Sequence, residues 1–302
     1  MNETSATSPT APDADDRLLS EPSLLTRSLR LVGGNRSGAI GFVLVALIVF
    51  AAIFAPWLAP YDPTAIMTGP RMAPPSPEHW LGTDNLGRDL LSRVIAGGRV
   101  AMLVAAAALG AALTGGLSLG LIAGLGPRWL DNTLLLIFDA LRSFPTIVFG
   151  LAVVTIIGPS LFTVILVVAI TSIPIYARIV RTQTLALKNV EFILAERAMG
   201  AGIARILFVH VLPNVLGPLL ILASMDVPLV IATEAGLSFL GMGVRPPTPS
   251  WGVILNDGYN FIRNSPWPVI SGSIPIILVT LGFTFMGEAL RDIFDPRLRR
   301  TH

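Results

Sequence analysis

Apolar residues dominate long runs of this 302-residue chain, and shorter polar segments separate the runs. A helix needs about 20 consecutive apolar residues to cross the hydrocarbon core of a bilayer. Four runs reach that size, at residues 39–59, 100–124, 214–233 and 269–287. Each of them predicts a membrane-spanning helix.

A fifth apolar stretch, residues 143–177, is too long at 35 residues for a single crossing. Gly158-Pro159-Ser160 interrupts it where a tight turn would fall. The pattern therefore predicts two further spans, at residues 133–157 and 161–177. The chain as a whole is predicted to be an all-α polytopic membrane protein with six transmembrane helices and both termini on one side.

Basic residues predict the orientation, because positively charged loops stay in the cytoplasm. With the N-terminus inside, the inner segments carry 14 of the 21 lysines and arginines, and the outer loops carry six. This bias predicts that both termini are cytoplasmic (N-in and C-in). Residues 1–22, rich in Ser, Thr, Ala, Pro and Asp, predict a disordered cytoplasmic tail, and residues 23–302 predict one transmembrane domain.

Composition excludes several classes of protein. With 53% hydrophobic and 13% charged residues and a mean hydropathy of +0.71, the chain cannot be a soluble globular domain. The net charge is only +2, and Lys188 is the single lysine, so no basic cluster points to nucleic acid. The chain has no cysteine, which excludes disulfides and cysteine-held clusters.

Catalytic and metal-binding motifs are missing. The three histidines, His79, His210 and His302, are scattered along the chain and form no paired metal-ligand motif. No Walker A pattern surrounds the only lysine, so the chain cannot hydrolyse ATP alone. The sequence therefore predicts a protein that is not an enzyme and binds no cofactor or metal itself.

Small residues form a stripe in the second predicted span, where Gly116, Gly120 and Gly124 recur every four residues. Such stripes let membrane helices approach closely. We favour packing within the subunit over a homodimer face.

Charged residues inside predicted spans are the first place to look for a transport path. Asp226 lies midway along the fifth span, and Glu234 lies near its outer end. Asp226 is expected either to face a substrate cavity or to pair with Arg142 or a partner subunit. Asp139 and Arg142 are three residues apart, which allows an ion pair on one helix face.

A polar segment, residues 185–213, interrupts the apolar pattern on the predicted cytoplasmic side. Its composition predicts a helix over 185–199 and a second over 201–212, joined by a hinge at Gly200, with Pro213 starting the next span. Because the segment lacks a basic face with large aromatic residues, docking into a groove on another protein fits it better than lying on lipid.

This segment resembles the EAA loop of ABC importer permeases, whose pattern is Glu-Ala-Ala, three residues, Gly, nine residues, and Ile-x-Leu-Pro. The corresponding positions here are Leu194-Ala195-Glu196, Gly200 and His210-Val211-Leu212-Pro213. The spacing is intact, but Leu194 and Glu196 alter the triplet and His210 replaces isoleucine. The resemblance implies that Ala195, Glu196, Gly200, Leu212 and Pro213 belong to an ATPase-coupling loop.

Two further stretches are similar to signatures of the dipeptide, oligopeptide and nickel permease family, specifically its dipeptide permease C type. They are WLGTDNLGRDLLSRVIAGGRV at 80–100 and EAGLSFLGMGVRPPTPSWGVILNDG at 234–258. Asp226, Glu234 and Trp251 are the candidates for a transport path or gate. Trp80, Asp84, Trp251 and Asp257 form either a gate, a dock for a binding protein, or a loop cap that stabilises the bundle.

The resemblance also implies partners and a location. It implies a multi-pass subunit of the bacterial cytoplasmic (inner) membrane that pairs with a homologous second permease and works with one or two ATPase subunits, which hold ATP and Mg. An extracytoplasmic binding protein would deliver the substrate. Peptide is the expected substrate, with nickel or glutathione as alternatives within the family. A secondary transporter or channel is the alternative of another class, and an intramembrane enzyme is disfavoured by the missing nucleophile–base pair.

Overall fold

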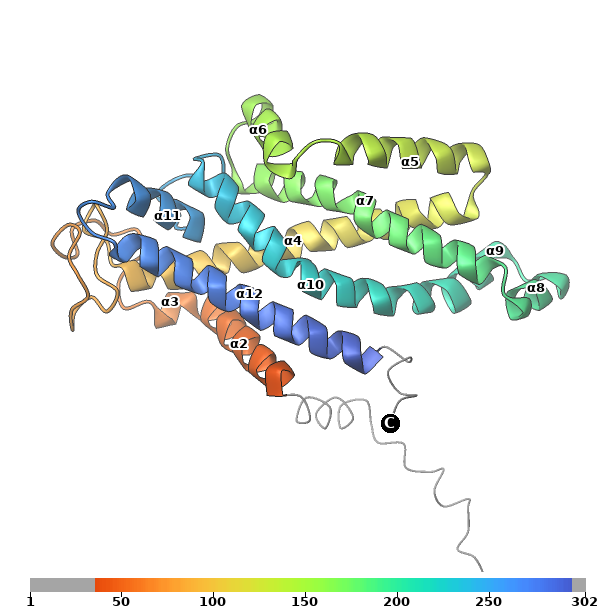
Figure 1. The fold of residues 1–302 in the computed structure, drawn as a ribbon, viewed down its shortest axis with the longest axis horizontal. Coiled ribbons are helices and arrows are strands. Elements are labelled where there is room, and N and C mark those ends of the chain that lie inside the picture. Colours follow the sequence, from red (N-terminus) through yellow and green to blue (C-terminus); the bar gives the residue numbers. More distant parts are fainter. Residues whose placement is uncertain (1–35, 295–302) are drawn as a thin grey trace, which may run out of the picture.

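The computed structural model describes residues 36–294, and the regular elements of that part of the chain are helices (Figure 1). Five helices are long and apolar enough to cross a membrane. They are α2 (Arg36–Ile53), α4 (Leu90–Leu125), α7 (Leu161–Lys188), α10 (Leu212–Phe239) and α12 (Trp267–Phe294). The all-α polytopic prediction is confirmed, whereas the predicted tail, residues 1–22, lies outside the described residues.

The sixth predicted span is not one continuous helix, and the prediction of an unbroken helix over 133–157 is wrong. The chain forms α5 (Arg128–Arg142) and α6 (Thr146–Ile157), which meet at an angle of 89°. Pro145 explains the break, because a proline lacks the backbone N–H and pushes the preceding residue out of the helical conformation. The pair makes a sixth span only if both halves are counted together.

Several helices extend beyond the apolar runs that predicted them. The helix α4 begins at Leu90 rather than near residue 100, because the Asp89 side chain accepts a hydrogen bond from the backbone N–H of Ser92 at 2.8 Å and caps it. The helix α7 continues to Lys188 past Arg178 and so reaches beyond residue 177. Hydropathy marks the part of a helix that suits lipid, while capping and hydrogen bonding decide where the helix ends.

Glycines lie in the most extensive helix contact of the described chain, between α4 and α7. A Cβ atom added to Gly116 would lie 2.4 Å from the Cβ of Tyr176, and one added to Gly120 would lie 2.5 Å from the carbonyl oxygen of Ala177. Neither position has room for a side chain. The prediction that the glycine stripe packs within the subunit is confirmed, and we call this contact the glycine seam.

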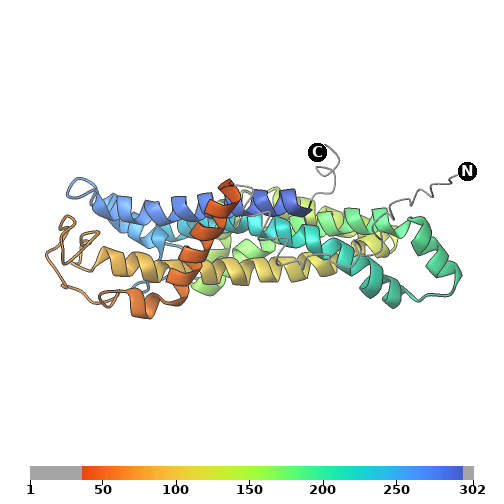
Figure 2. The same ribbon diagram turned by 90° about the horizontal axis from the view of Figure 1, so that it is seen from below.

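The two ends of the long axis carry different structures (Figures 1 and 2). One end holds the loops of residues 59–89 together with the short helices α3 (Ala55–Leu58) and α11 (Trp251–Asn260). The opposite end holds α8 (Glu191–Ala198) and α9 (Ile203–Arg205), which project past the ends of the neighbouring helices. The loop regions singled out in the sequence therefore lie at opposite ends of the bundle.

Candidate functional site

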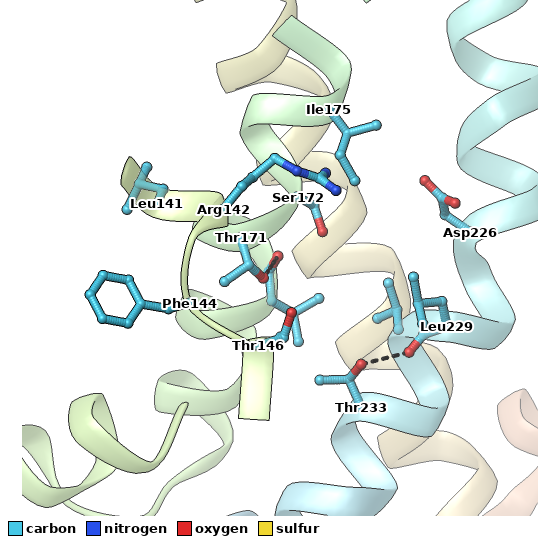
Figure 3. A pocket seen from close by; sticks show the side chains of 12 residues that line it. Leu141, Arg142, Phe144, Thr146, Thr171, Ser172, Ile175, Asp226, Leu229 and Thr233 are labelled. Carbon is cyan, nitrogen blue, oxygen red and sulfur yellow. Dashed lines mark hydrogen bonds between the residues drawn. The ribbon is translucent and has the colours of Figure 1, made fainter. Parts of the chain in front are cut away.

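A hollow of about 180 Å³ opens between the α5–α6 bend, α7 and α10 (Figure 3). Arg142 and Phe144 line it from the bend, Thr171 and Ser172 from α7, and Asp226 from α10. Ligand pockets usually enclose about 300–1,000 Å³. The hollow is smaller than that, so this chain by itself forms only part of a full-sized ligand cavity.

Asp226 lies at the edge of this hollow and is half-buried. Its Oδ2 accepts a hydrogen bond from the Tyr176 hydroxyl on α7 at 2.7 Å. Among the described residues, no ion pair joins Asp226 to Arg142. The carboxylate of Asp226 therefore lines a cavity and is held by a tyrosine rather than by Arg142, while its pairing with a partner subunit stays a prediction.

Arg142 does not pair with Asp139, so the expected pair within one helix is wrong. Asp139 instead accepts a hydrogen bond from the Arg178 guanidinium on α7. About two turns earlier on α5, Asp131 is held in the same way by Arg181. Two ion pairs thus fasten α5 to α7, and Arg142 is left to line the hollow. Sequence spacing could not reveal this, because it depends on the face that α5 turns toward α7.

Glu234 and Trp251 do not line the hollow. Glu234 is fully buried in α10 and accepts a hydrogen bond from the Ser238 hydroxyl at 2.7 Å. Trp251 is also buried, lies against Gly97 of α4, and donates from Nε1 to the carbonyl oxygen of Val94 at 2.9 Å. Both residues lie where α4, α10 and α11 pack together near the loop-rich end.

Charged residues from distant parts of the chain meet at that same end, and we call Asp84, Arg88, Arg93 and Asp257 the outer cluster. Arg88 contacts Asp84 at 2.6 Å and Asp257 at 3.1 Å. Arg93 is only 1% exposed and lies 3.4 Å from Asp84. Burial raises the pKa of Asp257, and the neighbouring Arg93 and Arg88 oppose that rise. Trp80, by contrast, is 70% exposed at the surface of the loops.

The loop at the opposite end begins with α8 and turns at Gly200, which has a φ of +90°. Positive φ favours glycine, so the hinge has a backbone reason for this residue. The second helix differs from the prediction, because α9 and a π-helical turn, η1 (Ile206–Val211), run on into α10 without a break at Pro213. The wider π turn leaves room for the Pro213 ring, which an α turn would press against the preceding turn.

Glu196 and His210, two of the three departures from the EAA pattern, lie next to each other. The His210 Nε2 atom is 3.4 Å from one carboxylate oxygen of Glu196, and Arg205 Nε is 3.4 Å from the other. The hinge places α8 against the start of the longer helix and so brings these residues together. In this chain, then, Glu196 links the two arms of the loop, which are α8 before the hinge and the α9–η1 segment after it. Ala195 adds a backbone contact, because its carbonyl accepts from the Met199 N–H.

Apolar side chains are exposed on the same loop. Met199 is 78% exposed and Ile203 is 71% exposed, Phe208 is also largely exposed, and Phe192 and Leu194 are about half exposed. Isolated exposed apolar residues are common, but a contiguous group of them marks an interaction surface. Ile193 and Ile206, in contrast, are buried inside the loop.

Comparison with known proteins connects these features. Residues 116–300 match the family model of the binding-protein-dependent transport system inner membrane component, and residues 23–75 match the N-terminal TM domain of oligopeptide transport permease C. The chain is 39% identical to the dipeptide transport system permease protein DppC of Alkalihalophilus pseudofirmus, covering 88% of this chain and 87% of that protein. It is 40% identical to the glutathione transport system permease protein GsiD of Pectobacterium atrosepticum, covering 85% and 86%.

A solved structure has the same fold. A chain of the MetNI methionine ABC transporter in an inward-facing conformation superimposes with a TM-score of 0.55 at 21% identity, covering 68% of this chain and 97% of that one. The expected resemblance to ABC importer permeases is confirmed by these matches. This multi-pass inner-membrane chain belongs to the family of binding-protein-dependent transport system inner membrane components.

Proposed function

We propose that this chain is a permease subunit of an ABC importer that carries peptides, and that it forms the transport path together with a homologous second permease. The observation that carries the second part is the size of the hollow, because about 180 Å³ is less than a ligand pocket usually encloses and a second permease would complete the cavity. The relatives named as dipeptide and oligopeptide permeases support the substrate class.

Separate ATPase subunits, which hold the ATP and Mg, would drive this path from the cytoplasmic side. The loop of residues 185–213 supports this, because it projects from one end of the bundle and exposes apolar side chains around a glycine hinge (Figure 2). We assign that end to the cytoplasm from the distribution of basic residues. Closure of an ATPase dimer would then move the loop and rock α10, with which the loop is continuous.

The loop-rich end would face an extracytoplasmic binding protein. Trp251 and most of the outer cluster (Asp84, Arg88 and Arg93) are buried there, which supports a stabilising role for them. The exposed Trp80 is a candidate contact for the binding protein. A gate at Trp251 or Glu234 would have to open this packed region, so we place the substrate contact at Asp226 instead.

Reconstitution tests the proposal. Proteoliposomes that contain this chain, its second permease and the ATPase subunits should take up a labelled dipeptide only when ATP and the binding protein are both supplied. Liposomes without the ATPase subunits are the control. Uptake in that control would instead indicate a secondary transporter or channel and overturn the assignment.

Glutathione is the second candidate substrate, because the chain is 40% identical to a glutathione permease. Competition in the same assay separates the two. Unlabelled dipeptide should suppress uptake of labelled dipeptide, and an equal concentration of glutathione should not. The opposite result would reassign the substrate within the family.

A further inference from the structure

We propose that the hollow contains a subsite for zwitterionic peptides, in which Arg142 binds the terminal carboxylate and Asp226 binds the terminal ammonium group. This proposal rests on the proposed peptide import and adds the residues that would read the substrate in the membrane. It begins from an unusual arrangement, namely opposite charges on facing walls of one cavity that do not pair with each other (Figure 3).

Arg142 is exposed at the α5–α6 bend and extends toward α7 (Figure 3). The nearest acid on its own helix, Asp139, is already bound by Arg178 from α7. Within residues 36–294 no side chain or carbonyl accepts a hydrogen bond from the Arg142 guanidinium. A guanidinium presents two parallel N–H donors that match the two oxygens of a carboxylate. A carboxylate inside the hollow would therefore accept the free N–H donors of the Arg142 guanidinium.

Asp226 lies across the hollow on α10 (Figure 3). Tyr176 donates to its Oδ2, and its Oδ1 accepts no hydrogen bond from any residue of the described chain. An unpaired aspartate within a transmembrane helix is costly. Because an ammonium group offers three N–H donors and a positive charge, it would offset that cost at the free oxygen.

The remaining surface suits the middle of a short peptide. The hydroxyls of Thr146 and Ser172 line the hollow, and neither bonds to another described residue. Val168 and Leu229 add apolar surface for side chains. Thr171 and Thr233, in contrast, already donate to carbonyls of their own helices. Charges at the two ends, free hydroxyls and apolar walls together match a molecule with charged termini and a varied centre.

Binding to the assembled importer without its binding protein tests the proposal directly, because the binding protein applies its own selection. The probes are labelled Ala-Phe, its C-terminal amide and its N-acetyl form, measured by equilibrium binding to the solubilised complex. In the wild type, each blocking group should weaken binding about tenfold, as expected for the loss of a charged hydrogen-bonded contact.

The variants Arg142→Gln and Asp226→Asn make the test specific. Arg142→Gln should weaken the binding of Ala-Phe about tenfold. The C-terminal amide should then bind this variant as well as Ala-Phe does, while the N-acetyl form should still bind more weakly. Asp226→Asn should show the reverse pattern. Arg142→Lys and Asp226→Glu keep the charges and should recover part of the affinity, which separates a lost contact from a misfolded complex.

Three results would overturn the subsite. One is that amidation weakens binding to Arg142→Gln as much as to the wild type, or that N-acetylation weakens binding to Asp226→Asn as much as to the wild type. Another is that a wild-type importer that transports peptides binds none of the three probes. The last is that Arg142→Gln removes bound phosphatidylglycerol, detected by native mass spectrometry, and leaves the response to amidation unchanged. Failure of the wild type to transport any peptide would instead count against the proposed function itself.

Discussion

The outer cluster and the hollow both bring arginine and aspartate together from distant parts of the chain. Only in the outer cluster do these residues form ion pairs with each other. Arg88 reaches both Asp84 and Asp257, and Arg93 lies within 3.4 Å of Asp84. In the hollow, Arg142 and Asp226 face a shared space instead. Buried charges that are fully paired hold a structure together, whereas charges left open on facing walls indicate a ligand.

This difference predicts opposite responses to mutation. Loss of one partner from the outer cluster leaves a buried charge without compensation, which is strongly destabilising. Loss of a charge in the hollow removes a group that the folded chain does not pair, so it should change binding and leave stability nearly unchanged.

Asp84→Ala should have the largest effect. It leaves Arg88 and Arg93 buried with one carboxylate between them, and breaking a buried pair costs about 3–5 kcal/mol. Thermal unfolding of the purified importer should show a clearly lower midpoint. The control is Arg71→Gln, which alters an exposed arginine in the same loop region. An unchanged midpoint for Asp84→Ala would show that the outer cluster does not hold the loops.

Gly116→Ala should destabilise the glycine seam by about 1–3 kcal/mol, because an added Cβ overpacks the contact with Tyr176. Tyr176 also donates to Asp226, so this variant should weaken peptide binding as well. Gly124→Ala is the matched control, since its Cβ would meet Thr184 instead. It should destabilise by a similar amount and leave binding intact. Equal binding loss in both variants would contradict the link between seam and hollow.

Gly200→Val should mainly affect coupling. Valine is strained at a φ of +90°, and the hinge would have to change its conformation. Membrane insertion should be normal, because the hinge lies outside the apolar runs, while ATP-driven uptake should fall at least tenfold relative to ATP hydrolysis. Gly202→Val, next to the hinge but at a φ of −69°, is the control. Undiminished uptake by Gly200→Val would remove the coupling role from the hinge.

Glu196→Lys should reduce coupling less severely. The reversed charge would repel Arg205 and His210 rather than link the two arms of the loop, but these contacts are 3.4 Å long and partly exposed. Such pairs contribute about 0–1 kcal/mol. The measured quantity is the ratio of peptide taken up to ATP hydrolysed, with Glu191→Lys on the same helix as the control. A normal ratio for Glu196→Lys would mean that the altered triplet is neutral.

Arg142→Gln should leave the unfolding midpoint almost unchanged, since the guanidinium is exposed and unpaired in the folded chain. Asp139→Asn gives a useful reference, because it breaks a partly exposed pair with Arg178 and should cost no more than about 1 kcal/mol. A large loss of stability in Arg142→Gln alone would show that Arg142 stabilises the fold, as the outer cluster does, and is not kept for a ligand.

Local features of the sequence predicted much of the architecture. Apolar run length placed all the long helices, because crossing a bilayer depends on the sum of neighbouring side chains. Gly200 marked the hinge for a similar reason, since its backbone conformation is a property of one residue. The break at Pro145 carried a local signal too, and the prediction of one continuous helix over 133–157 overlooked it.

What the sequence by itself determined is therefore the five long membrane helices, the hinge and the family. Only the tertiary structure decided which charges meet: Tyr176 reaches Asp226 across 50 positions, and Arg88 reaches Asp257 across 169. The tertiary structure also pairs Asp139 with Arg178 of α7 rather than with Arg142 of its own helix. The reason is physical, because hydropathy adds up along a chain, whereas an ion pair depends on which faces two helices turn toward each other when they pack.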